Sequence, residues 1–261
     1  MGTRLWSELK TSDFAGESHA RIAVLPVAAT EQHGPHLPLG TDAYILEAIL
    51  ARVETEEDIL ILPLQTIGDS LEHSDFPGTL SQRAETLITS WLAVGHAVAE
   101  TGIRKLAILN SHGGQPQIVD IVAKRLRAER GMAVARINTF LLGVPEGLFA
   151  SDELAFGYHG GEVETSMMLA ARPDLVDMKA AQSFSSSAAK MARENIALYA
   201  EGAAALAWQA QDLNPQGVTG NAAGADAMQG VQVLSYIARR VSDALSDLAA
   251  LDLSDLREGP G

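Results

Sequence analysis

The sequence predicts an α/β fold of three layers, in which helices cover both faces of a mostly parallel central sheet. Three observations carry this prediction. Four short apolar runs lie in the first half of the chain, and longer segments with the apolar spacing of a helix alternate with them. Such alternation is typical of a parallel sheet with helical crossovers. The composition, 47% hydrophobic and 20% charged residues, is that of a globular protein.

The predicted strands are rich in Val, Ile and Leu and short enough to be buried within a sheet. They cover Arg21–Ala28, Asp58–Leu64, Arg104–Asn110 and Met132–Asn138. In open parallel sheets, ligands gather where the carboxyl ends of the strands lead into loops. We therefore expect the chemistry of this chain at that edge.

The predicted helices show apolar residues every three or four positions. They cover Ala43–Glu56, Ala84–Glu100, Gln115–Arg130 and two alanine-rich segments, Ser185–Gln211 and Ala225–Leu251. Gly102 and Gly131 stand just past two of these helices, where a glycine commonly ends a helix. Thr41 and Asp42 stand where an N-cap of the first helix would lie.

The 261 residues are expected to form one domain, because no linker or internal repeat interrupts the pattern. The formal net charge of -14 opposes binding to nucleic acid or to an anionic membrane surface. No stretch approaches the roughly 18 consecutive apolar residues of a membrane span, and the N-terminus lacks the pattern of a signal peptide. We therefore expect a cytoplasmic protein with a small-molecule partner.

Potential metal ligands are dense after the first predicted strand, in Glu31-Gln32-His33-Gly34-Pro35-His36 and again at Asp42. The chain has no cysteine, so His, Asp and Glu are the residues left to bind a transition metal. Glu31 and His33, two positions apart in an extended segment, project to the same side, whereas His36 faces elsewhere. Asp42 has a second interpretation, because an aspartate at the start of a helix is an ordinary N-cap.

The third predicted strand ends in Asn110-Ser111-His112-Gly113-Gly114, which brings His112 to the same edge of the sheet. A single histidine near a strand end is more often an ordinary loop residue than a ligand. The clustering of His112 with the candidates after the first strand favours the ligand. His36 and His73 are candidate pocket residues, while His19 and His96 are expected to be structural.

A second dense segment, Tyr158–Ser166, precedes an apolar run with helical spacing. If the helix begins just before Glu162, then Glu162 and Ser166 share one face, and Glu164 lies about 200° away. We therefore expect Glu162 to be the ligand, unless it merely complements the helix dipole. Glu164 competes with it for the metal or supports a ligand from behind. His159, beside two glycines, could hydrogen-bond to a ligand carboxylate.

Taken together and in order, these motifs resemble the creatininase family. The matching segments are Glu31–Gly34, Gly40–Asp42, His73–Thr79, Asn110–Gly114, His159–Ser166 and Gly217–Gly220. Each segment alone is weak, but their order and spacing are specific and span the chain. The resemblance implies the creatininase-like three-layer fold and a homo-oligomer, commonly a hexamer.

The resemblance also implies two divalent metal ions per chain, with Zn, Mn and Fe all compatible with oxygen and nitrogen ligands. Glu31 and His112 would bind one ion, His33 and Glu162 the other, and Asp42 would bridge them. The expected metal ligands are thus Glu31, His33, Asp42, His112 and Glu162, and the candidate catalytic residues are His159 and Glu164.

The implied activity is hydrolysis of the C–N bond of a cyclic amide or N-formyl amide. A hydroxide bridging the metals would attack the carbonyl, and His159 would protonate the leaving nitrogen. Creatinine-hydrolysing members carry a glutamate where this chain has Gly114 and a tryptophan where it has Ala155, so creatinine itself is a poor candidate. The alternatives are a peptidase, a ring-ketone hydrolase and a non-catalytic protein that binds a metal or a ligand.

Overall fold

The computed structural model describes residues 2–15 and 21–256. Its centre is a five-stranded sheet in the order β1-β3-β2-β4-β5, in which all neighbouring strands are parallel. The strands are β1 (Gly2–Leu5), β2 (Ile22–Val27), β3 (Asp58–Ile61), β4 (Lys105–Asn110) and β5 (Ala133–Asn138). The four predicted strands are therefore confirmed. The edge strand β1 was not predicted, because its residues are mostly exposed and show no apolar run.

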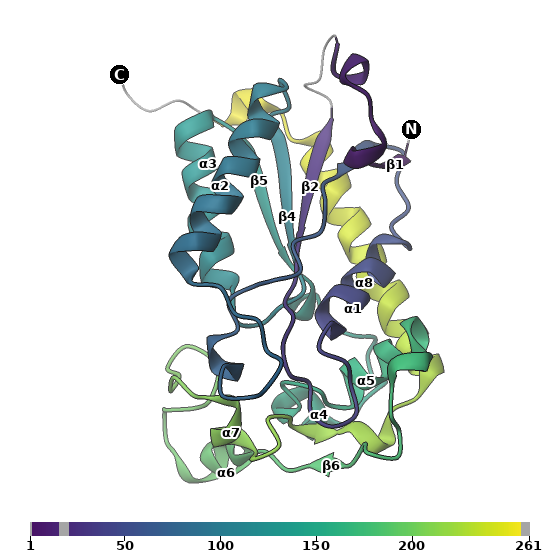
Figure 1. Cartoon of the computed structure of the whole chain (residues 1–261), viewed down its shortest axis with the longest axis vertical. Coiled ribbons are helices and arrows are strands. Elements are labelled where there is room, and N and C mark those ends of the chain that lie inside the picture. Colours follow the sequence, from purple (N-terminus) through teal and green to yellow (C-terminus); the bar gives the residue numbers. More distant parts are fainter. Residues whose placement is uncertain (1, 16–20, 257–261) are drawn as a thin grey trace.

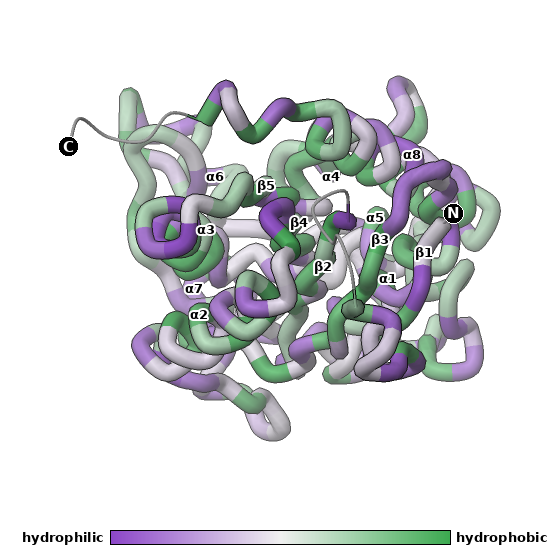
Figure 2. Tube along the Cα trace, turned by 90° about the horizontal axis from the view of Figure 1, so that it is seen from above, coloured by the Kyte–Doolittle hydropathy of each residue, from purple (hydrophilic) through white to green (hydrophobic). Residues whose placement is uncertain are grey.

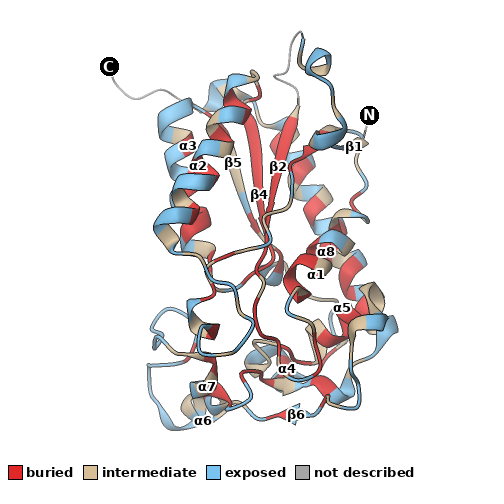
Figure 3. Cartoon of the chain, in the orientation of Figure 1, coloured by how far each residue is buried: buried red, intermediate tan, exposed pale blue. Residues whose placement is uncertain are grey.

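Helices cover both faces of this sheet, as Figures 1 and 2 show from two directions. One face carries α2 (Ala84–Glu100) and α3 (Pro116–Arg130), and the other carries α1 (Thr41–Leu50), α5 (Glu162–Ala171) and α8 (Ala227–Ala250). Successive strand residues point to opposite faces, so Ala23 and Leu25 pack with the first layer and Ile22 and Val24 with the second. Burial on both faces explains the continuous apolar runs (Figure 3). The predicted three-layer fold is confirmed.

The smaller elements lie beyond the carboxyl ends of the strands, in the lower part of Figure 1. They are α4 (Ser151–Phe156), α6 (Ser187–Glu194), α7 (Ala210–Leu213) and the antiparallel pair β6 (Ser183–Phe184) and β7 (Gly220–Asn221). Within the described residues, none of the helices combines the length and apolarity that crossing a membrane requires.

Two predicted helices differ from the structure. The segment Ser185–Gln211 forms α6 and the start of α7, but residues 195–209 between them are not helical. Residues 201–207 are exposed, so their helix propensity has no packed face to stabilise it. The first helix begins at Thr41 rather than at Ala43 and ends at Leu50 rather than at Glu56. Its N-cap is Gly40, so Thr41 and Asp42 lie inside its first turn and neither side chain caps it.

The helices α5 and α8 pack so closely that one position of α8 accepts no side chain. A Cβ atom added to Gly230 would lie 1.9 Å from the Ser166 carbonyl oxygen of α5. Gly230→Ala is therefore expected to lower the free energy of unfolding by at least about 2 kcal/mol, despite the better helix propensity of alanine. Urea unfolding followed by circular dichroism measures this change. Ser235→Ala, on the exposed face of α8, is the matched control, and equal midpoints for the two variants would contradict the packing.

Candidate metal centre

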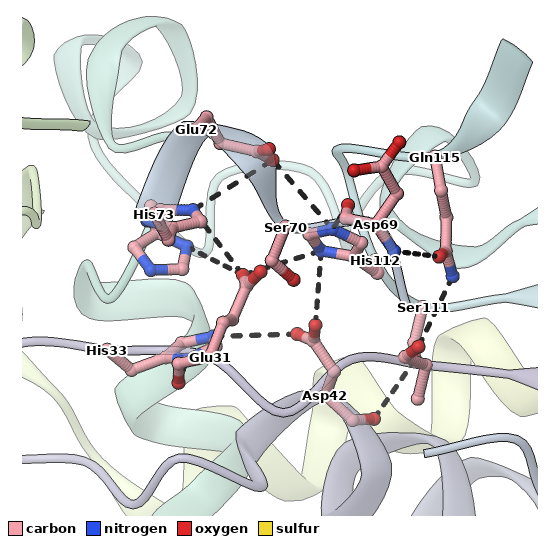
Figure 4. A network of polar contacts seen from close by, with 12 residues as sticks. Glu31, His33, Asp42, Asp69, Ser70, Glu72, His73, Ser111, His112 and Gln115 are labelled. Carbon is pink, nitrogen blue, oxygen red and sulfur yellow. Dashed lines mark hydrogen bonds and ion pairs between the residues drawn. The ribbon is translucent and has the colours of Figure 1, made fainter. Parts of the chain in front are cut away.

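Carboxylate and imidazole side chains from two loops and the first turn of a helix converge where the strands end. Figure 4 shows Glu31 and His33, which come after β2, around one centre with His112, which comes after β4. Asp42 reaches the same centre from the first turn of α1. The side chains of these four residues are at most 4% exposed. The edge of the sheet predicted from the sequence therefore holds a buried polar cluster.

Among the described residues the potential ligand atoms form three groups; one is Glu31, His73 and His159, and Asp42 links the other two. In the first of these two, His112 Nδ1 lies 3.4 Å from Glu31 Oε1 and 3.3 Å from Asp42 Oδ2. The second contains His33, His159 and Glu164, whose ligand atoms lie within 4.8 Å of one another. Asp42 joins the groups, because its Oδ1 lies 3.5 Å from His33 Nε2. This arrangement suits two neighbouring ions that share one carboxylate.

The histidines of the cluster are oriented by the main chain. His33 Nδ1 donates to Glu31 O over 3.1 Å, His112 Nε2 to Asp69 O over 2.7 Å, and His159 Nε2 to Gln32 O over 2.6 Å. A carbonyl oxygen only accepts, so these outer nitrogens carry the hydrogen. The inner nitrogens His33 Nε2, His112 Nδ1 and His159 Nδ1 therefore keep a lone pair for a metal ion or a proton.

A buried amide supports the position of His112. The Gln115 side chain donates to Asn110 Oδ1 over 3.0 Å and to Ala28 O over 3.3 Å, and its Oε1 accepts from Asp69 N over 3.2 Å. Asp69 is the residue whose carbonyl oxygen receives the His112 hydrogen. Gln115 thus holds the main chain that in turn fixes the His112 ring.

Charges inside the cluster shift its titration strongly. Burial opposes the charged form of His33, but the charge and contact of Asp42 outweigh it and raise the pKa of His33 to about 9. Burial also opposes the charged form of His112, yet Glu31 and Asp42 raise its pKa well above the ordinary value. Against the effect of burial, His112 lowers the pKa of Glu31 well below its ordinary value. Without metal ions, the protonated imidazoles of His33 and His112 thus neutralise the carboxylates of Asp42 and Glu31. Bound metal ions would take over this role.

The donor set fits divalent transition metals. Glu31 Oε2 and His33 Nε2 are buried and have no hydrogen-bond partner among the described residues. Unpaired buried polar atoms are costly, and cations bound at these atoms would satisfy them. Carboxylate and imidazole ligands are those used by Zn, Mn and Fe(II). The cluster is therefore a candidate centre for two such ions.

The structure does not bring Glu162 into this cluster, contrary to our expectation. Its carboxyl carbon lies near Gly224, where an added Cβ would be 3.3 Å away, and its main-chain nitrogen donates to Glu153 Oε1. Glu164 lies with His33 and His159 instead. The two glutamates do lie on different sides of α5, as predicted, but the Glu162 side is turned away from the metal ligands. The expected role of Glu162 as a ligand therefore has no geometric support.

Two residues from the loop after β3 lie at the cluster: His73, which the sequence indicated as a candidate pocket residue, and Glu72, which it did not indicate. His73 Nε2 lies 3.5 Å from Glu31 Oε1, and Glu72 Oε1 lies 3.7 Å from His112 Nε2. Burial raises the pKa of Glu72 to about 7. One feature of the sequence could have indicated both residues: they follow the second predicted strand, whose carboxyl end lies at the same edge of the sheet as Glu31.

The other histidines lie away from the centre where the structure describes them. His36 Nε2 faces Thr165 Oγ1 at 3.0 Å and its ring stacks on Phe184, so the prediction that it points elsewhere is confirmed. His96 pairs with Glu129 near the surface, in line with a structural role. His19 lies outside the described residues.

Comparison with known proteins gives a consistent result. The family model Creatininase, described as creatinine amidohydrolase, matches residues 7–245. The mycofactocin precursor peptide peptidase of Mycobacterium ulcerans is 32% identical over 237 residues, covering 87% of this chain and 84% of that protein. The creatinine amidohydrolase of Pseudomonas putida is 29% identical over 198 residues, covering 68% of this chain and 74% of that protein.

Solved structures agree at the level of the fold. A creatininase with a tryptophan replaced by alanine superposes with a TM-score of 0.76 at 22% identity, covering 95% of this chain and 99% of that one. Solved creatininases of similar TM-score, 0.72 and 0.70, are described as a manganese form and a zinc-zinc form. At such identities the likeness concerns the arrangement of the chain.

Proposed function

The chain belongs to the creatininase family of metal-dependent amidohydrolases, and from this premise we propose that it cleaves the C–N bond of a cyclic amide or N-formyl amide. The observation that carries the proposal is the pair of ligand groups that Asp42 links, beside an imidazole nitrogen left free for proton transfer. The Gln32 carbonyl oxygen leaves that nitrogen, His159 Nδ1, without a hydrogen.

The proposed ligands follow the geometry of the two groups. Glu31, Asp42 and His112 would hold one divalent ion. His33 and Glu164 of the second group would hold the other, with Asp42 bridging from 3.5 Å beside His33, and the third member of that group, His159, is reserved for proton transfer. Zn, Mn and Fe(II) all suit these ligands. When bound, such ions polarise a substrate carbonyl and lower the pKa of water to about 7.

His159 is the proposed proton carrier. Its ring lies between those of His33 and His73, with centroid separations of 4.1 and 4.2 Å, so its orientation is held on both sides. Because Nε2–H is bound to Gln32 O, Nδ1 takes up a proton from the attacking water and delivers it to the leaving nitrogen. His159→Ala would remove this transfer without removing Glu31, Asp42 or His112.

Cleavage of a peptide bond is the second candidate. The relative named mycofactocin precursor peptide peptidase, 32% identical over 87% of this chain, favours it. The same groups serve both reactions, because a peptide bond is also an amide and its hydrolysis needs the same proton transfer. The identity of the cleaved bond separates the two candidates.

A substrate panel on the metal-loaded protein tests the proposal. Cyclic amides, N-formyl amides and short peptides are incubated with protein loaded with Zn, Mn or Fe(II), and products are identified by mass spectrometry. We expect about two metal ions per chain by elemental analysis, and turnover of cyclic or N-formyl amides that chelation abolishes. Turnover of peptides alone would assign the second candidate. Fewer than about one ion per chain, or undiminished turnover after chelation, would refute both.

A further inference from the structure

We propose that Glu72 is a specificity-determining residue that binds a free amino group of the substrate next to the amide bond to be cleaved. This inference rests on the proposed amide hydrolysis at this centre and adds the chemical class of the substrate. Three features support it: the exposure of Glu72, the space left by Gly114 and the hydrogen bonds of the two neighbouring histidines.

Glu72 lies on the open side of the cluster. Its side chain is 18% exposed and that of His159 is 13% exposed, whereas the side chains of Glu31 and Asp42 are 1% and 4% exposed. Figure 4 shows the Glu72 carboxylate above His73 and His112, across the centre from Asp42. Glu72 is therefore more accessible to a ligand than Glu31 or Asp42.

The chain leaves room for this carboxylate. A Cβ atom at Gly114 would lie 2.1 Å from Glu72 Oε1 and 2.6 Å from His112 Nε2. Any larger residue at this position would displace the Glu72 carboxylate or the His112 ring. Gly114 thus allows a carboxylate from the loop after β3 to reach the edge of the centre.

The neighbouring histidines do not satisfy the Glu72 carboxylate. His112 Nε2, at 3.7 Å, already donates its hydrogen to Asp69 O. His73 Nε2 lies at 4.0 Å, and the ring is neutral because Nδ1 accepts from Gln32 Nε2 over 2.8 Å.

The hydrogens of the Gln32 amide are both in use, because its Nε2 also donates to Gly217 O over 2.6 Å. Gln32 therefore keeps His73 from becoming a cationic partner of Glu72. Within the described residues, no side chain donates a hydrogen bond to the Glu72 carboxylate, so its acceptor capacity remains open to a ligand.

An amino group is the ligand that this environment selects. An ammonium ion provides several N–H donors and a positive charge, and charge-assisted hydrogen bonds to a carboxylate are about twice as strong as neutral ones. The Glu72 carboxylate itself disfavours an anionic group beside it. Because Glu72 borders His112, a bound amino group would lie close to the amide that the centre cleaves.

Binding of two simple probes to the metal-loaded protein tests this inference. L-leucinamide carries a free amine, and N-acetyl-L-leucinamide is the matched probe without it. We expect calorimetry to show about tenfold tighter binding of leucinamide, equal to about 1.4 kcal/mol. Glu72→Gln, which keeps the shape of the side chain, should abolish the difference. Asp75→Asn, at an exposed acid in the same loop, is the control that should preserve it.

Elemental analysis and turnover are measured alongside binding, so that failure of the inference on Glu72 can be told apart from failure of the proposed function. Glu72→Gln should retain its metal ions, and among substrates turned over by the wild type it should raise KM for those with a free amine more than it lowers kcat. The absence of a preference for leucinamide in the wild type, its persistence in Glu72→Gln, or loss of metal from that variant would each overturn the inference. Failure of the proposed function appears separately, as a lack of turnover by the metal-loaded wild type on every amide of the panel.

Discussion

The Glu31→Gln variant is expected to bind metal at least about a hundredfold more weakly than the wild type and to lose its turnover accordingly. Replacing residues that merely orient a ligand already costs about 10- to 100-fold in metal affinity, and Glu31 is a proposed ligand itself. Its Oε1 lies 3.4 Å from His112 Nδ1, 3.5 Å from His73 Nε2 and 3.8 Å from His159 Nδ1. Loss of its charge therefore affects three imidazoles at once.

Calorimetric titration with Zn or Mn and elemental analysis of the dialysed protein measure this effect, and the panel substrate gives the rate. Glu47→Gln, at an exposed acid of α1, is the matched control and should leave metal content unchanged. Thermal unfolding of the metal-free proteins separates a folding defect from a ligand defect. A folded Glu31→Gln protein that retains the metal content and rate of the wild type would contradict the proposed centre.

The paired variants Glu164→Gln and Glu162→Gln are expected to differ sharply. Glu164 lies with His33 and His159, so its loss should weaken the second ion by about a hundredfold or more and lower turnover in parallel. Its carboxylate also accepts from Gly160 N over 2.5 Å, which ties the loop before α5 to the centre. Glu162 lies apart from these groups, so its amide variant should keep both ions.

The same assay on both variants makes the comparison internal, because the two substitutions change the same chemistry two positions apart on one helix. Metal stoichiometry is the decisive reading, since a loss of stability alone would lower neither the number of bound ions nor their affinity in the folded fraction. If Glu162→Gln lost an ion while Glu164→Gln kept it, the orientation of α5 towards the centre would be wrong.

The strands and most of the cluster could be predicted from local sequence. Buried parallel strands need apolar residues on both faces, so β2 and β4 are visible as continuous runs. Residues just past the carboxyl ends of parallel strands lie at one edge of the sheet, which places Glu31, His33 and His112 near one another without further information. The creatininase-family match confirmed the family inferred from these motifs.

The choice between Glu162 and Glu164 could not be made from periodicity. Helical geometry gives the angle between two side chains, but the direction in which the helix faces is set by tertiary packing. Here α5 packs on α8 through Ser166 and Gly230, which lie 64 positions apart in the chain, and Ser166 Oγ accepts from Asp226 N. That contact turns the side of α5 with Ser166 towards α8 and leaves Glu164 for the centre.

The role of Glu72 was hidden for a similar reason. Its distance from His112 depends on how the loop after β3 folds back, and no pattern within the loop specifies that path. The prediction of a helix across residues 195–209 failed because alanine favours helices only where a packed face supports them. Features set by local sequence, such as the buried strands, could thus be predicted, whereas features set by long-range packing, such as the position of Glu72, could not.

The main-chain anchoring of the histidines has an evolutionary consequence. Because His112 and His159 give their outer hydrogens to the backbone carbonyl oxygens of Asp69 and Gln32, which are not proposed metal ligands, those two residues can change side chain and still hold the rings. Mutations in the pocket wall can then alter substrate preference step by step, while the reactive machinery is inherited intact. Proteins of this design can change their substrate more readily than their reaction. The two relatives named as a peptide peptidase and a creatinine amidohydrolase agree with this, because both names denote hydrolysis of an amide bond.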